Sequence, residues 1–399
     1  MLARFSRFVS VPRTFHKVQE LLNGATIISM RKSLSVLTLG LLVLFAIGLM
    51  RTVTERGDFS TKNPGLAAVT AVAKKKDCAL TPRPREFNAA PYYEGPLIDA
   101  HLHMPVSSSI VAAVGRRMGF EHMPSFGGTL TPDYLACLLK GEGIKQTIGF
   151  FLMTRFSLGA EVRTAANFQK NYPGLIAPFF MPGTNDTLRI STSTAKSTLQ
   201  KNKGLFKGIG EIKMFDNGSI FRPVFLAHYD LAKEQKIPVM LHPFHEHKSE
   251  VIRLLERYPE VRFLFHGGDE REWIMEIIKR FPNSYRSVDD VFALYGWGFG
   301  HERTKPGKEE FLAYFREHFD EMLAQALSDW KGRIEAYPDR FMWGTDRWYD
   351  WHFDYEVGGL LTEFGRAFIG RLSPAVQEQF AYKNAERLVK NNTAASAPG

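Results

Sequence analysis

The segment LIDAHLHMP, residues 97–105, places two histidines one residue apart at the end of a short apolar run. In an extended chain, residues i and i+2 point to the same side, so we expect His101 and His103 to project together from the end of a strand. Two interpretations fit this segment alone: a pair of solvent-facing loop histidines, or half of a metal site. The rest of the chain decides between them.

Seven further apolar runs follow, and helical patterns separate most of them. Near-continuous apolar strands that alternate with helices indicate a parallel sheet covered by helices. Eight such repeats favour closure into a (β/α)8 TIM barrel; the alternative, an open doubly wound sheet, lacks the Gly-x-Gly-x-x-Gly sequence expected after its first strand. The predicted strands lie within residues 96–103, 146–153, 175–182, 206–215, 237–244, 261–268, 284–291 and 340–346.

Residues of metal-binding type interrupt several of these apolar runs near their C-terminal ends. Beyond His101 and His103, they are Glu211, His242, His266 and Asp346. In TIM barrels the C-terminal strand ends meet at one face, where active sites lie. A single buried histidine is more often a core residue than a ligand, but this set at one face predicts a site for a divalent transition metal, with zinc as first choice.

The basic charge of the chain is confined to its N-terminal part. The 399 residues carry a net charge of +9, and residues 1–76, with 12 Lys and Arg against 3 Asp and Glu, account for all of it. The remainder has no basic surplus for binding a phosphate backbone. We therefore expect no nucleic-acid partner.

An apolar segment without charged residues, 33–50, follows the basic N-terminal segment 1–32. Its 18 residues suffice for a membrane-spanning helix, and Arg31 and Lys32 before it leave the N-terminus in the cytoplasm by the positive-inside rule. The sequence thus predicts a transmembrane or signal-anchor helix, with the catalytic domain tethered on the periplasmic or extracellular side. The alternatives are a buried core helix and a cleaved signal peptide, which would make the protein secreted.

Other segments lack the strand and helix pattern. Residues 51–95 mix Gly, Pro, Ala, Thr and Lys without periodicity and predict a linker, and residues 391–399 predict a disordered tail. About 48 residues separate the seventh and eighth strands, and the glycines between aromatic residues at 295–300 suggest a mobile flap in this insertion. Cys78 and Cys137 permit one disulfide.

Taken in order, five motifs resemble the amidohydrolase superfamily, more narrowly its amidohydrolase-related branch of TIM-barrel metal-dependent hydrolases. They are DAHLH (99–103), GEIKMF (210–215), MLHP (240–243), FLFHGG (263–268) and MWGTD (342–346). The closing segment 372–389 is similar to the C-terminal helix of that branch. The resemblance covers residues 96–390, but neither the apolar N-terminal segment nor the insertion after strand 7.

The resemblance implies ligand roles for individual residues. His101, His103 and Asp346 would hold a metal in a first position. His242 would bind the same metal or a second ion, and His266 would bind metal or polarise the substrate.

The resemblance leaves open whether one or two ions bind. Glu211 matches the strand 4 carboxylate that bridges two metals in nuclease-like relatives, so it raises a two-metal site as one alternative. Lys213 is also similar to the carboxylated lysine of other branches. The other interpretation of Lys213 is an inward-facing lysine paired with Glu211.

The implied activity is hydrolysis of a small carbonyl ester, lactone or amide, in which Asp346 transfers the proton of the attacking water and His266 polarises the carbonyl oxygen. Non-oxidative decarboxylation is the alternative within the superfamily, DNA hydrolysis is third, and a membrane-anchored pseudoenzyme or binding module is the non-enzyme alternative. The expected partner is a small-molecule substrate, and a homo-oligomer is compatible with the sequence. Substrate contacts are predicted for Arg347, Trp348, His245 and Asp289.

Overall fold

The computed structural model describes residues 83–87, 90–105, 130–183, 189–213, 218–267, 273–289 and 307–390. Eight parallel strands form one sheet, in which each strand pairs with the next along the chain. Each run predicted to be a strand contains one, so this prediction is confirmed. The strands are β1 Leu97–His103, β2 Ile144–Met153, β3 Ile176–Pro182, β4 Gly208–Lys213, β5 Val239–His242, β6 Phe263–Phe265, β7 Ser284–Val288 and β8 Phe341–Trp343.

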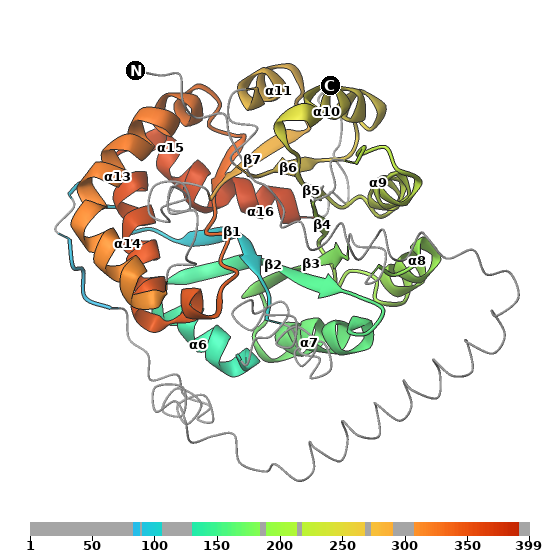
Figure 1. Ribbon diagram of the computed structural model, residues 1–399, viewed down its shortest axis with the longest axis horizontal. Helices are drawn as coiled ribbons and strands as arrows, with labels where there is room; N and C mark the ends of the chain where they lie inside the picture. The colour runs from blue at the N-terminus through green and yellow to red at the C-terminus, as the bar shows by residue number, and fades with distance from the viewer. Residues whose placement is uncertain are drawn as a thin grey trace, which may run out of the picture. The chain divides into compact units, whose positions relative to one another are not determined.

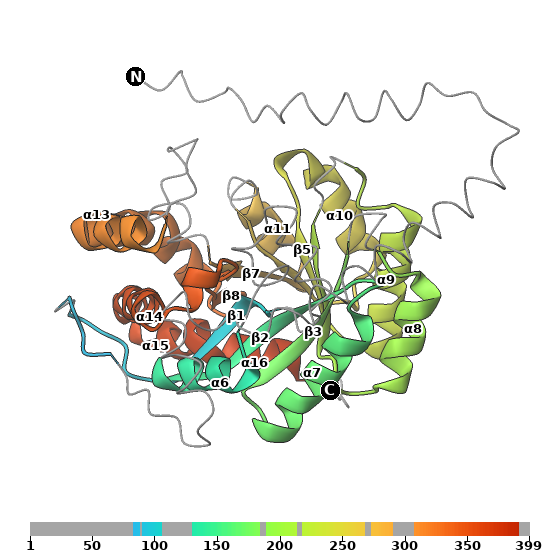
Figure 2. The same ribbon diagram turned by 60° about the horizontal axis from the view of Figure 1, so that its bottom comes forward.

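The sheet closes between its first and last strands, which lie side by side in Figure 2. Leu102 on β1 pairs with Arg347 in a parallel bridge, and the N–H of His103 donates to the carbonyl oxygen of Arg347 at 3.1 Å. The N–H of Asp346 donates to the carbonyl oxygen of His101 at 2.8 Å. The residues just after β8 thus complete the ring of strands. The predicted TIM barrel is confirmed.

Helices surround the strands, as Figure 1 shows. The local sequence explains where two of them begin. The side chain of Thr131 accepts the N–H of Tyr134 at 3.2 Å. Pro132 and Pro223 occupy first-turn positions, where the missing proline N–H would have no partner within the helix. The helices are α6 Pro132–Gly141, α7 Leu158–Asn171, α8 Thr192–Lys201, α9 Pro223–Gln235, α10 Lys248–Arg257, α11 Ile274–Arg280, α13 Lys308–Ala336, α14 Tyr355–Gly370, α15 Pro374–Glu378 and α16 Asn384–Val389.

The barrel interior below the strand C-termini is apolar. Ile98, Phe150, Phe179 and Met240 belong to one buried cluster inside it, which Leu388 of α16 joins. Lys145 at the start of β2 pairs with Glu386 of α16, so this helix closes the N-terminal end of the barrel. A packed floor of this kind leaves the opposite end, at the strand C-termini, as the place for polar residues.

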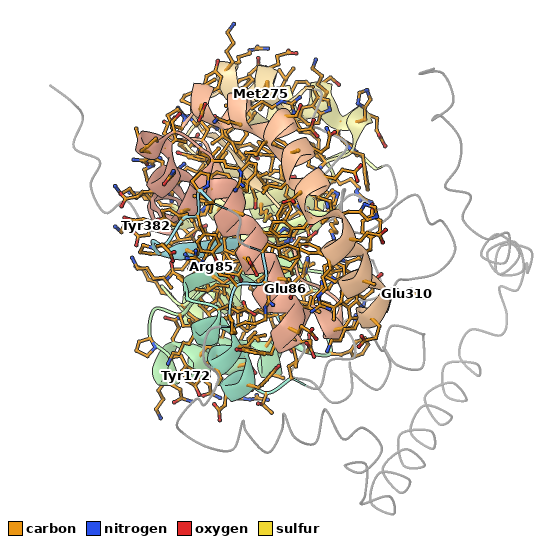
Figure 3. All side chains as sticks on the ribbon, turned by 90° about the vertical axis from the view of Figure 1, so that its left-hand side faces the viewer. Arg85, Glu86, Tyr172, Met275, Glu310 and Tyr382 are labelled. Carbon is orange, nitrogen blue, oxygen red and sulfur yellow. The ribbon has the colours of Figure 1, made fainter. Side chains whose placement is uncertain are left out.

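Part of the predicted linker packs on the barrel. We call residues 83–87 and 90–96 the strap; it crosses helices α13 and α14, and Figure 3 labels Arg85 and Glu86 on it. The carboxylate of Glu363 on α14 accepts the backbone N–H groups of Glu86 and Phe87 at 2.7–3.0 Å. The Phe87 ring stacks on Phe319 of α13 with centroids 3.9 Å apart. Residues that pack on the barrel therefore lie before the predicted boundary at residue 96.

Several predictions concern residues outside the described ranges: the apolar helix 33–50, the flap at 295–300, the tail 391–399 and Cys78. Among the residues described, no helix combines the length and apolarity that crossing a membrane requires. Cys137 on α6 is disulfide-bonded. The insertion after β7 contains the long helix α13.

A buried ion pair lies beside the seam between β1 and β8. The guanidinium of Arg347 donates to both carboxylate oxygens of Glu142, at 2.9 and 2.7 Å, and both side chains are at most 1% exposed. Glu142 directly follows α6, so the pair ties that helix to the strand that closes the barrel. Two parallel hydrogen bonds fix the orientation of both groups.

We predict that Glu142→Ala lowers the free energy of unfolding by about 3–5 kcal/mol, because it leaves the Arg347 guanidinium buried without a counter-charge. Urea denaturation followed by circular dichroism measures this. Glu234→Ala is the matched control, since its partner Lys196 is half exposed and water can replace the lost contact. Equal effects of the two substitutions would contradict the argument.

Candidate metal centre

The residues predicted from strand ends come together at the C-terminal end of the barrel. His101 and His103 lie on β1, with ring centroids 5.0 Å apart, which confirms that they share one side of the strand. Glu211 and Lys213 project together from β4. The remaining members of the cluster end β5 or follow β6, β7 and β8; they are His242, His266, Asp289 and Asp346.

Four donor atoms in this cluster face one another. Nε2 of His103 lies 3.1 Å from Oδ1 of Asp346 and 3.3 Å from Oε2 of Glu211, and Nε2 of His101 lies 3.3 Å from the same Asp346 oxygen and 3.9 Å from the same Glu211 oxygen. All four atoms are buried, and among the described residues none makes a hydrogen bond of good geometry, although Nζ of Lys213 lies 3.3 Å from the Glu211 oxygen. We call them the first donor set.

The first donor set fits a divalent transition metal. Ligand bonds of 2.0–2.1 Å in a tetrahedron place the ligand atoms about 3.3 Å apart, close to most of these separations. Unpartnered polar atoms in a barrel interior are costly unless something binds them. His101, His103 and Asp346 also form a group whose ligand atoms all lie within 4.8 Å of one another. Nitrogen and carboxylate donors are those that zinc prefers.

A second donor set converges on the other oxygen of Glu211. Nδ1 of His242 lies 2.8 Å from Oε1, and Nε2 of His266 makes a closer contact with the same atom. Glu211 therefore presents Oε2 to the first donor set and Oε1 to the second. A carboxylate with each oxygen turned to a different pair of histidines suits a bridge between two ions.

Asp289 orients two of these histidines. Its Oδ2 is 2.8 Å from Nδ1 of His101 and 3.7 Å from Nδ1 of His266. Since the hydrogen bond holds the Nδ1 proton of His101, Nε2 of that ring is the free ligand atom. The predicted role of Asp289 was only a substrate contact, although its position at the end of strand 7 is the same signal that indicates the candidate ligands.

Asp99 is a functional residue that the sequence analysis did not single out. Its carboxylate accepts the N–H of His101 at 3.0 Å and both the N–H and the hydroxyl of Thr345, at 2.9 and 2.5 Å. These bonds fasten the backbone beside a β1 ligand to the backbone beside Asp346. Burial raises the pKa of Asp99 to about 7, against the opposing effects of Arg347 and Thr345.

The backbone before Asp346 is also specialised. Asp346 has φ +47°, a left-handed conformation that costs energy for a residue other than glycine, although aspartate tolerates it better than most. A Cβ atom on Gly344 would lie 2.5 Å from Oγ of Ser287 and 3.3 Å from Cβ of His101. Only glycine allows β8 to approach the first donor set this closely.

The carboxylates of the cluster are held ionised. Burial opposes the charge of Asp346, but His101 and His103 outweigh it and lower its pKa to about 2. The pKa of Glu211 is likewise held well below its usual range, since Lys213 and His266 overcome the effect of burial.

The histidines respond to the same charges in different ways. Burial opposes the charge of His266 too, yet Glu211 and Asp289 raise its pKa to about 10. Burial lowers the pKa of His242 to about 4. In the metal-free protein, protonated His266 and Lys213 thus neutralise part of a strongly anionic cluster.

Solvent reaches the cluster from one side. The side chains of Asp346, His242 and Lys213 are 22%, 21% and 18% exposed, whereas the other members are almost fully buried. A substrate would therefore meet these three groups first. The Nζ atom of Lys213 lies 3.3 Å from Oε2 of Glu211, as in the interpretation of Lys213 as a partner of Glu211.

The predicted substrate-binding residues differ in position. Arg347 requires a correction: its guanidinium is buried in the pair with Glu142 and does not face the open side of the cluster. Trp348 is half buried and stacks on Tyr349 with centroids 4.3 Å apart. His245 is exposed at the start of the short helix η1, His245–His247, after β5. Substrate contacts of Trp348 and His245 stay predictions.

Solved structures similar to the chain share little sequence with it. One is an amidohydrolase from Burkholderia multivorans with bound zinc, at 14% identity, 74% of this chain and 99% of that chain covered, and a TM-score of 0.49. Another is a putative 2-pyrone-4,6-dicarboxylic acid hydrolase from Pseudomonas putida, with 17% identity, 75% of this chain and 98% of that chain covered, and a TM-score of 0.46. A third is a 5-carboxyvanillate decarboxylase from Sphingomonas paucimobilis, with 16% identity, 74% of this chain and 98% of that chain covered, and a TM-score of 0.46.

No curated protein matches the chain. A family model does: that of the amidohydrolases matches residues 98–390, from the second residue of β1 to the residue after α16. This match takes in every member of the candidate metal-binding cluster and most of the chain. The protein therefore belongs to the amidohydrolase family.

Proposed function

We propose that this protein is a metal-dependent hydrolase of a small carbonyl ester, lactone or amide, with positions for two divalent ions, most suitably zinc. The observation that carries the proposal is the pair of donor sets that share Glu211. Membership of a family of hydrolases and decarboxylases supports the general chemistry. The similar structures named above act on their own substrates, and they do not identify the substrate of this chain.

In this proposal, every ligand except Glu211 belongs to one position. His101, His103 and Asp346 would hold the first ion, and His242 and His266 the second, with Glu211 shared. The ions would supply Lewis acidity, which lowers the pKa of water from about 16 to about 7 and polarises a carbonyl oxygen.

The chain's own residues would complete the reaction. Asp346, the partly exposed carboxylate, is placed to accept the proton of the attacking water and to pass it to the leaving group. Asp289 would keep the His101 and His266 rings in their orientations through the reaction. If only one ion binds, Nε2 of His266 is instead available to donate a hydrogen bond to the carbonyl oxygen.

We predict that purified protein, incubated with zinc and dialysed, retains about two ions per chain by mass spectrometry. The double substitution His101→Ala with His103→Ala should remove the ion of the first position, and Glu211→Gln should lower the content towards one, because a neutral amide is a poor bridge. His318→Ala, which replaces a surface histidine on α13, is the control and should change nothing. One ion in both the unmodified protein and Glu211→Gln would show that Glu211 is no bridge.

We predict acid release without carbon dioxide release when the metal-loaded enzyme meets a panel of aryl esters, lactones and anilides alongside hydroxybenzoic and enoic acids. A hydrolytic site needs water next to the substrate, and the exposed side of this cluster admits it. A pH-stat records hydrolysis, and a carbon dioxide electrode records decarboxylation. Asp346→Asn should lower the hydrolytic rate about 10²- to 10⁴-fold. Carbon dioxide evolution with no hydrolysis would assign the protein to the decarboxylases.

We also propose that the barrel is exported and tethered by residues 33–50. The disulfide of Cys137 supports this, since disulfides persist mainly in oxidising compartments. We predict that the protein sediments with membranes and that Leu42→Arg with Leu44→Arg abolishes this, because each arginine opposes insertion by about 2.5–3.5 kcal/mol. Recovery of the unmodified protein in the soluble cytosolic fraction would refute the tether.

A further inference from the structure

Lys213 occupies a distinctive place in the cluster. It ends β4 directly opposite His242 in the strand register, and with His242 and Asp346 it forms the exposed side of the cluster. Among these three groups, Lys213 carries the cation. A lysine side chain ordinarily carries a positive charge at neutral pH.

The carboxylate of Glu211, which Lys213 contacts, is also a candidate metal ligand. The ammonium group contacts Oε2 of Glu211, the oxygen that belongs to the first donor set. When Glu211 binds ions through its two oxygens, their charge competes with Lys213 for the same carboxylate. The ammonium group is then less fully neutralised in the loaded site than in the structure described here.

The net charge of the whole cluster also favours an anionic ligand. Three carboxylates, Glu211, Asp289 and Asp346, and the ammonium of Lys213 together give a net charge of −2 when the histidines are neutral. One divalent ion makes this sum zero, and two make it +2. A loaded two-ion site therefore attracts an anion, and Lys213 supplies a directed donor for it on the open side.

An apolar ring adjoins the same side. The half-buried Phe244 ring lies 5.6 Å from that of His242. A ligand that reaches Lys213 past these groups gains by carrying an apolar body.

We propose that Lys213 is a substrate-binding residue that binds the carboxylate of an anionic substrate with an apolar body. This inference rests on the proposed function and narrows its substrate class. The competing explanation is that Lys213 serves only to neutralise Glu211, in which case it has no preference among ligands.

Benzoate and benzamide test this, because they share a ring and differ in charge. Isothermal titration calorimetry of the zinc-loaded full chain should show benzoate binding more tightly than benzamide. Lys213→Met should weaken benzoate binding about 10- to 100-fold, the range of one charge-assisted hydrogen bond, and change benzamide binding less than about twofold. Lys213→Arg should restore most of the benzoate affinity. Zinc content measured on each variant shows whether the donor sets are intact.

Three results would overturn the inference. They are equal affinities of the unmodified protein for the two ligands, equal weakening of both by Lys213→Met, and no weakening of benzoate. The first needs no variant, so the test survives a Lys213→Met protein that does not fold or loses zinc. Failure of the proposed reaction is distinguishable: Lys213-dependent benzoate binding without hydrolytic turnover would retain the anion site and reject hydrolysis. Turnover of neutral esters that is indifferent to Lys213→Met would do the reverse.

Discussion

The mutual repulsion of Glu211, Asp289 and Asp346 is the constraint on which the site depends. Ionised carboxylates that are shielded from water, as those of Glu211 and Asp289 are, cost several kcal/mol each unless cations or hydrogen-bond donors compensate them. Histidines surround every one of the three, and Glu211 divides its two oxygens between different histidines. In the metal-free protein, His266 takes up a proton with a pKa of about 10 to supply part of the missing charge. Divalent ions therefore suit this cluster of carboxylates better than the proton on His266 does.

The barrel satisfies this constraint by fixing strand ends rather than loops. The Asp99 carboxylate accepts backbone N–H groups on both sides of the seam between β1 and β8, and the N–H of Asp346 donates to the carbonyl oxygen of His101. Gly344 permits the close approach that brings β8 beside His101. Ligands held in this way by backbone and neighbouring hydrogen bonds have little freedom to move apart, so the site is organised before any ion binds.

Sequence alone predicts most of the fold and the cluster of candidate ligands, because both follow from local patterns. Eight apolar runs predict the strands, and residues of metal-binding type near their C-terminal ends predict the cluster of His101, His103, Glu211, His242, His266 and Asp346. What it does not predict depends on partners far away in the chain. Arg347 looks like a substrate-binding residue beside Asp346 until Glu142, some 200 residues earlier, proves to bind it. Asp99 and the strap are likewise explained by contacts with residues far away in the sequence, Thr345 and Glu363.

Two cations near the site illustrate why partner geometry decides function. The Arg347 guanidinium is buried and makes two hydrogen bonds with the carboxylate of Glu142. The two charges neutralise each other, so this pair has a structural role. The Lys213 ammonium is partly exposed and lies 3.3 Å from Oε2 of Glu211, an oxygen that His101 and His103 also approach. Its pairing can therefore be shared or replaced, whereas that of Arg347 cannot be given up without leaving a buried charge. Of these two basic residues, only Lys213 is placed to bind an anionic ligand.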